Sequence, residues 1–103
     1  MENFNIHPTA KIGKGCEILA ESVNIGPNVV IGENFKFNGQ SLTIGKMSRI
    51  DKNFKAECRR LTIGENLYCM NDVEIGRGGN RSEFSTVDIG DNVGIFDHVV
   101  INP

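Results

Sequence analysis

Apolar residues recur along most of the chain at intervals of six, six and seven positions. Stepping in both directions from Ile25, the rhythm meets Ile6, Ile12, Ile18, Ile31, Phe37, Ile44, Ile50, Ala56, Ile63, Cys69 and Ile75. The pattern therefore repeats every nineteen positions, and the stretch LTIG marks it directly at 42–45 and 61–64. A period of this length predicts a solenoid, in which each repeat forms one coil and successive coils stack.

The residues two positions before these are also apolar, with Ser48 the one strongly polar exception. Residues i and i−2 point to the same side of a β-strand, so each six-residue unit reads as a short strand with two inward side chains, followed by a bend. Three units close one coil. An α-helix would need apolar spacings of three and four, and it would not accommodate so many glycines and β-branched residues.

The bends form two columns of residues that suit tight corners. Three residues after the first-unit positions stand Thr9, Asn28, Met47, Asn66 and Asn92, and three after the second-unit positions stand Gly15, Asn34, Asn53, Asp72 and His98. Glycine, asparagine, aspartate and histidine tolerate left-handed backbone conformations better than other residues do. The corners therefore predict the same register as the apolar positions.

The rhythm breaks once, after Ile75, and resumes at Ile89, Ile95 and Ile101. The step from Ile63 to Ile89 is longer than one period by seven positions, which predicts a loop over 76–86, GRGGNRSEFST. Such a loop either packs on its own coil or a neighbouring protomer, or contacts a ligand. In the second case Arg77, Asn80 and Arg81 are the candidate substrate-binding residues, because arginines hold phosphates or carboxylates by charge-assisted hydrogen bonds.

Units such as IGPNVV, IGENFK and IGDNVG, and the opening IHPTAKIG, resemble the hexapeptide-repeat family over nearly the whole chain. The resemblance implies an all-β fold: a left-handed parallel β-helix of about five triangular coils, in a single domain over 1–103. It also implies a homotrimer and an acyltransferase that uses acetyl-CoA or another acyl-CoA. Typical acceptors in the family are sugars, amino acids and antibiotics.

Composition and charge limit the classes of molecule that the chain is expected to bind. With 103 residues, a net charge of −2 and no long apolar run, the chain gives no reason to expect nucleic acid or a membrane. The N-terminus lacks a secretion signal and the three cysteines suggest no disulfide framework, so we expect a cytoplasmic protein. Val99 and Ile101 face inward on a coil that does not close by Pro103, so we expect either that this segment belongs to a longer chain or that a partner covers its end.

Histidine is the general base that an acyltransferase of this kind uses, and the chain has two. His98 is the candidate catalytic residue, whereas His7 lies in the first, incomplete coil. Asp97 stands beside His98, but adjacent residues on a strand or bend usually point apart. The corner column explains His98 without catalysis, and the family's base commonly lies in a later coil. Two histidines cannot supply the three ligands of the zinc enzymes with this fold, so no metal is expected.

Two functions therefore remain open. The first is an acyl-CoA-dependent acyltransferase, or the N-terminal part of one, acting on a small polar acceptor such as a sugar or amino compound. The second is a non-catalytic, trimerising scaffold. Among the cysteines, Cys16 and Cys69 fall on inward positions, and Cys58 is predicted to lie at a solvated corner.

Overall fold

Short parallel strands make up the whole regular structure. The computed structural model describes residues 4–76 and 86–101, which contain 15 β-strands in three five-stranded parallel sheets and no helix. The first sheet consists of β1 (Phe4–Ile6), β4 (Ser22–Ile25), β7 (Ser41–Ile44), β10 (Arg60–Ile63) and β13 (Thr86–Ile89). The second consists of β2 (Lys11–Ile12), β5 (Val30–Ile31), β8 (Arg49–Ile50), β11 (Tyr68–Cys69) and β14 (Gly94–Ile95). The third consists of β3 (Glu17–Leu19), β6 (Lys36–Asn38), β9 (Lys55–Glu57), β12 (Glu74–Ile75) and β15 (Val100–Ile101).

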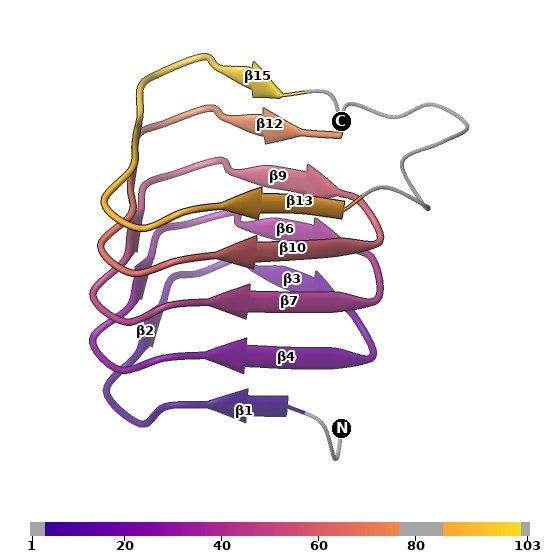
Figure 1. Ribbon diagram of the computed structural model, residues 1–103, viewed down its shortest axis with the longest axis vertical. Helices are drawn as coiled ribbons and strands as arrows, with labels where there is room; N and C mark the ends of the chain where they lie inside the picture. Colours follow the sequence, from indigo (N-terminus) through magenta and orange to yellow (C-terminus); the bar gives the residue numbers. More distant parts are fainter. Residues whose placement is uncertain (1–3, 77–85, 102–103) are drawn as a thin grey trace.

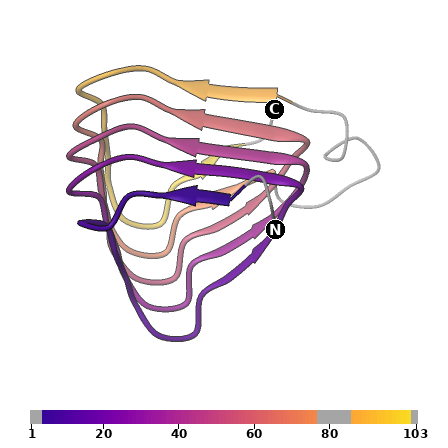
Figure 2. The same cartoon turned by 90° about the horizontal axis from the view of Figure 1, so that it is seen from below.

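The chain visits the three sheets in turn and climbs one strand spacing per coil. Figure 1 shows β1 at one end of the stack and β15 at the other, and Figure 2 shows the triangular outline that the coils share. Four full turns separate β1 from β13, because the first sheet runs in the order β1-β4-β7-β10-β13. The prediction of an all-β, parallel solenoid is confirmed.

The register between coils follows the sequence period residue by residue. In the first sheet Ile6 pairs with Ile25, Ile25 with Ile44, Ile44 with Ile63, and Ile63 with Ile89. The last pairing is the longer step, so the extra positions lie between β12 and β13, as predicted. Residues 77–85 themselves lie outside the described residues.

Glycines follow the isoleucines because adjacent coils approach closely at the first corner. The amide of Gly45 donates to the carbonyl of Ile63 at 2.8 Å, and that of Gly26 donates to the carbonyl of Ile44 at 2.9 Å. A Cβ added to Gly45 would lie 2.5 Å from the carbonyl oxygen of Gly64 in the next coil, well inside van der Waals contact. The repeated Ile-Gly pair thus combines an inward side chain with a corner that has no room for one.

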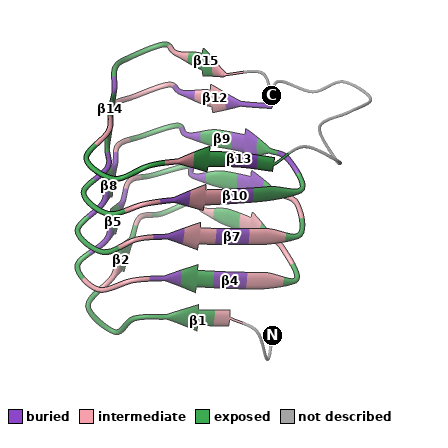
Figure 3. Cartoon of the chain, in the orientation of Figure 1, coloured by how far each residue is buried: buried purple, intermediate pink, exposed green. Residues whose placement is uncertain are grey.

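The core is a continuous apolar column inside the coils. Inward residues of the central coils are buried (Figure 3), and the rings of Phe35 and Phe54 stack with centroids 5.1 Å apart and planes 6° apart. Ser48 is also fully buried, yet its hydroxyl donates to the Gly64 carbonyl at 3.0 Å and accepts the Leu67 amide at 3.2 Å. Both bonds offset the cost of burying a hydroxyl.

Two inward positions of the first coil differ from this pattern. Ile6 and Ile12 are 39% and 40% exposed. In the described structure the first coil has a neighbour on one side only, so the open end leaves these side chains in contact with solvent. The inward direction was predicted correctly, but the extent of burial depends on the coil below as well as the coil above.

The corner columns adopt the backbone conformation that the sequence predicted. Positive φ angles of 57–63° occur at Asn28, Asn34, Met47, Asn53, Asn66, Asp72, Asn92 and His98, and Gly15 has φ +73°. Thr9, in the first coil, is the one predicted corner residue that does not share this conformation. The corner role of His98 is therefore confirmed at the level of its backbone.

The core predicts a strong contrast between neighbouring substitutions. Ile44 is 1% exposed at the centre of the stack, whereas Lys46 is exposed at the bend that follows. We expect Ile44→Asp to abolish folding, because it removes an aliphatic group worth about 1.5–3 kcal/mol and buries a charge. Lys46→Asp should change the free energy of unfolding by less than about 0.5 kcal/mol. Thermal unfolding followed by circular dichroism tests this, and equal melting temperatures would contradict the register.

Met47 provides a second test, at the first corner. It has φ 63° although it is neither glycine nor asparagine, and three residues of its column are asparagine. Met47→Asn should raise the free energy of unfolding by about 1 kcal/mol, because asparagine tolerates the left-handed region better. The matched reverse change, Asn66→Met, should lower it by a similar amount. A destabilising Met47→Asn would mean that contacts of the methionine side chain outweigh the backbone strain.

Candidate functional site

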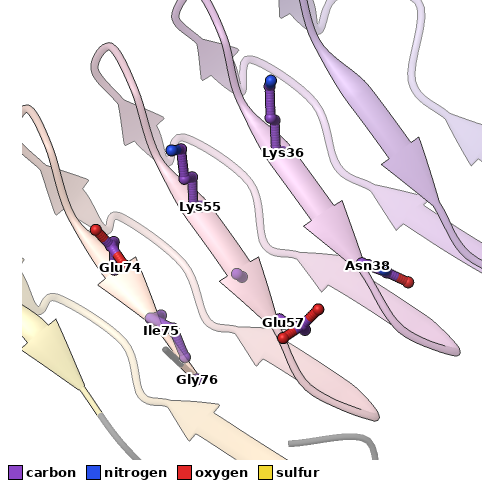
Figure 4. Close-up of a pocket in the computed structure, with 8 residues that line it drawn as sticks. Lys36, Asn38, Lys55, Glu57, Glu74, Ile75 and Gly76 are labelled. Carbon is purple, nitrogen blue, oxygen red and sulfur yellow. The ribbon is translucent and has the colours of Figure 1, made fainter. Parts of the chain in front are cut away.

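A row of four charged side chains crosses the outer face of the third sheet, with two lysines flanked by two glutamates. Strand pairing places Glu17, Lys36, Lys55 and Glu74 next to one another on successive coils. The Lys36 ammonium lies 3.5 Å from a Glu17 carboxylate oxygen, and Figure 4 shows Lys36, Lys55 and Glu74 side by side. These side chains are too exposed for such pairs to stabilise the fold by much. The row therefore contributes little to holding the coils together.

Two shallow depressions adjoin on this face and together form what we term the third-sheet groove. The larger, of about 260 Å³, is lined by Lys36, Asn38, Lys55, Ala56, Glu57, Glu74, Ile75 and Gly76. The smaller, of about 230 Å³, is lined by Asn53, Lys55, Asp72 and Glu74. Lys55 and Glu74 belong to both depressions, so the groove runs from the second corner towards the end of β12. Its lining carries charges of both signs, together with the amide groups of Asn38 and Asn53.

A ladder of side-chain hydrogen bonds follows the second corner beside the groove. The amide of Asn34 donates to the Asn53 oxygen at 3.2 Å, and the amide of Asn53 donates to Asp72 Oδ1 at 3.0 Å. The next member of the column is His98, whose Nδ1 lies 3.8 Å from Asp72 Oδ2. The His98 side chain is 78% exposed, so its backbone forms the corner while its ring projects outward.

The carboxylate beside His98 in the sequence serves a different purpose. Asp97 Oδ1 accepts the backbone amide of Asn71 in the coil below at 2.8 Å. Asn71 in turn accepts the amide of Lys52 through its side-chain oxygen at 3.0 Å, so this column closes the corner between coils. The expectation that Asp97 and His98 point apart agrees with this geometry, and the carboxylate that the His98 ring approaches is that of Asp72.

Of the remaining candidate residues, His7 belongs to the described part of the chain and the three loop residues do not. Arg77, Asn80 and Arg81 lie outside the described residues, although Gly76, which precedes them, lines the groove. His7 lies in the first coil, where its Nδ1 contacts the Thr9 hydroxyl at 2.8 Å and accepts the Thr9 amide at 3.1 Å. His7 thus helps to form a local turn.

Sequence reasoning missed two features that its own period contained. Glu17, Lys36, Lys55 and Glu74 follow one another at exact steps of one period, and Asp72 precedes His98 in the same corner column by the one longer step. The corner column of the sequence already places Asp72 one coil before His98, and the structure adds that their side chains approach each other. The charged row lies at outward positions, where the period of nineteen applied to charged residues identifies it.

The cysteines are all free, and one of them corrects a prediction. Cys58 was expected at a solvated corner but is fully buried, and burial raises the pKa of its thiol above the ordinary value, against a smaller lowering by a backbone hydrogen bond at Arg60. Its column at the third corner holds the small residues Ala20 and Gly39, which lie against the core. A Cβ on Gly39 would meet the carbonyl oxygen of Cys58. The third corner therefore has room for small side chains only, and that of Cys58 points into the core.

Cys69 faces inward as predicted. Its burial, with a smaller contribution from the negative charge of Asp51, raises the pKa of its thiol to about 12. Among residues 4–76 and 86–101, no group of three or more histidine, cysteine or acidic side chains is arranged to hold a metal ion. Nor does that part of the chain contain a helix long and apolar enough to cross a membrane. No family model, curated protein or solved structure matches the chain.

The Cys69 thiol predicts how stability changes in alkali. The folded state holds its proton up to a pKa of about 12, whereas the unfolded thiol releases it near pH 9.0. Ionisation of this thiol therefore leaves the free energy of unfolding unchanged below pH 9. The free energy of unfolding then falls as the pH rises towards 12, by at most about 2 kcal/mol at pH 10.5. Urea unfolding at pH 8 and pH 10.5 should show a smaller loss in Cys69→Ala than in the wild type. Equal losses would contradict the raised pKa.

Proposed function

We propose that the chain is an acyl-CoA-dependent acyltransferase of the hexapeptide-repeat kind, or the N-terminal part of one, acting on a small polar acceptor. The observation that carries the proposal is the stacking of Ile-Gly hexads into three parallel sheets with the period read from the sequence. This is the architecture that the resemblance implies. The proposal includes a cytoplasmic location, in keeping with three free thiols. Fold by itself does not fix an activity, so the chemistry has to come from the site.

The third-sheet groove offers the acceptor a polar surface, and His98 offers a base beside Asp72, which lines the groove. A corner backbone and a catalytic ring are compatible, because φ concerns the main chain while the imidazole projects outward beside Asp72. In this proposal Arg77, Asn80 and Arg81 contact the substrates from the segment that follows Gly76. The two guanidinium groups suit the phosphates of an acyl-CoA.

The reaction is a direct transfer. His98 takes the proton of an acceptor hydroxyl or amine, and the freed electron pair forms a bond to the thioester carbonyl carbon. The carbon–sulfur bond then breaks, and the departing CoA thiolate takes up the proton from the imidazolium. The protein's contribution is to hold donor and acceptor in line, which converts an encounter of two molecules into one oriented step.

A homotrimer is part of the proposal, and one observation also supports the alternative of a non-catalytic trimerising scaffold. The second sheet exposes Val30 and Tyr68, at 38% and 47%, and Phe96, directly after β14, is 71% exposed. The exposed Met47 lies just before β8 of the same sheet. Apolar and aromatic side chains of this kind are enriched in protein–protein interfaces. A scaffold would use this surface and not the third-sheet groove. The enzyme therefore needs the imidazole of His98, whereas the scaffold does not.

Turnover of acetyl-CoA separates the two functions. The protein is incubated with acetyl-CoA and a set of sugars and amino compounds, and release of the CoA thiol is measured. We expect His98→Asn, which preserves the corner, to lower turnover by ~10²–10⁴ while the melting temperature stays nearly unchanged. His7→Asn is the matched control and should retain activity.

Sedimentation at micromolar concentration complements this assay. A trimer with turnover that depends on His98 supports the enzyme. A trimer without turnover on any acceptor supports the scaffold, and a monomer contradicts the assembly on which both functions depend. Normal turnover in His98→Asn would place the base elsewhere.

A further inference from the structure

The ring of His98 lies close to a carboxylate on a neighbouring coil. An imidazole serves as a base through one nitrogen when the other donates its proton to a fixed acceptor, which also sets the tautomer. His98 Nδ1 lies 3.8 Å from Asp72 Oδ2. This exceeds a hydrogen bond, but catalytic contacts are often long before substrate binds and then tighten. Since Nδ1 faces the carboxylate, Nε2 is the nitrogen left for an acceptor.

Asp72 is itself held in place. Its Oδ1 accepts the side-chain amide of Asn53 at 3.0 Å, and Asn53 accepts that of Asn34 at 3.2 Å. All three residues have φ of 62–63°, so their side chains leave equivalent corners in the same direction. Each amide donates towards the next coil, and the chain of donors ends on a carboxylate. Because Oδ1 is engaged, Oδ2 is the oxygen that meets the histidine.

The other acid near His98 is not available for this purpose. Asp97 Oδ1 accepts the backbone amide of Asn71 at 2.8 Å, which fixes the carboxylate within the corner. The two acids thus have different contacts: Asp97 binds the backbone of the turn, and Asp72 lies next to the His98 ring. The Asp72–His98 pair also needs the stack to be intact, since its members come from two different coils.

We infer that Asp72 is a positioning residue, which holds the neutral ring of His98 in the Nδ1–H tautomer with Nε2 turned outward as the basic nitrogen. This inference rests on the proposed function for its catalytic meaning. Its structural content, the tautomer of His98, can be measured without any substrate. In this inference the hydrogen bonds from Asn34 to Asn53 and from Asn53 to Asp72 fix the Asp72 carboxylate, which in turn orients the His98 ring on the next coil.

The two histidines provide an internal contrast for the test. Nδ1 of His7 accepts the Thr9 amide, so a neutral His7 carries its proton on Nε2. We expect ¹⁵N–¹H correlation spectra of the two neutral rings to show opposite tautomers. His7→Asn and His98→Asn assign the signals. A His98 signal with the proton on Nε2 in the wild type would overturn the inference.

Matched variants identify the residue responsible. Asp72→Asn keeps a side chain suited to φ 62° and an oxygen for Asn53, but can present a donor to His98 Nδ1, which should shift the ring towards Nε2–H. Asp97→Asn removes the same charge, keeps an oxygen for Asn71 and should leave the tautomer of His98 unchanged. A change in Asp97→Asn and none in Asp72→Asn would assign the role to Asp97 and overturn the inference.

Kinetics separate failure of this inference from failure of the proposed function. If both hold, Asp72→Asn lowers kcat at least ~10-fold with little change in KM, and Asp97→Asn does not. If Asp72 controls the tautomer but neither Asp72→Asn nor His98→Asn affects turnover, the positioning is confirmed and the catalytic role of His98 is wrong. Loss of turnover in Asp72→Asn with an unchanged His98 tautomer overturns the positioning role.

Discussion

Backbone hydrogen bonding between successive coils is the constraint on which the rest of the structure depends. Each coil must place its amides and carbonyls opposite those of the next, as the bond from Gly45 to the Ile63 carbonyl shows. Coils of unequal path would lose these bonds, and buried unpaired backbone groups are costly. The constant period is therefore a geometric requirement, and the extra positions of one coil fall in a single segment between β12 and β13.

The same constraint selects side chains at three kinds of position. Inward positions require apolar side chains that pack against those of the next coil, as the stacked rings of Phe35 and Phe54 do, and the buried Val73 follows them in the same column. Corner positions need positive φ, which explains their asparagines and makes Met47 an exception. Outward positions carry no such requirement. Whatever is specific to this protein should therefore be sought on its outer faces, where the fold leaves the choice of residue open.

Stacking of the coils also brings together polar side chains that are far apart in the sequence. Residues one period apart become neighbours, so a polar side chain at one corner finds a partner on the next coil. The Asn34–Asn53–Asp72 ladder is the product of this rule, and His98 joins it because its coil stacks in register despite the longer interval. The proposed role of His98 relies on this ladder, since a general base is most effective when it is held in place before the reaction. The proposed chemistry uses a feature that already stabilises the corner.

The sequence by itself determined the strand order, the register and the inward and corner columns, because burial and backbone conformation recur with the period and leave their mark on residue type. It also located the long interval between Ile63 and Ile89. Tertiary structure alone decided that Cys58 turns inward, that Ile6 is partly exposed, and that Asp72 rather than Asp97 faces His98. These outcomes depend on which side chains meet across coils. Sequence neighbours at a tight corner diverge, whereas residues a whole coil apart along the chain come together once the coils stack.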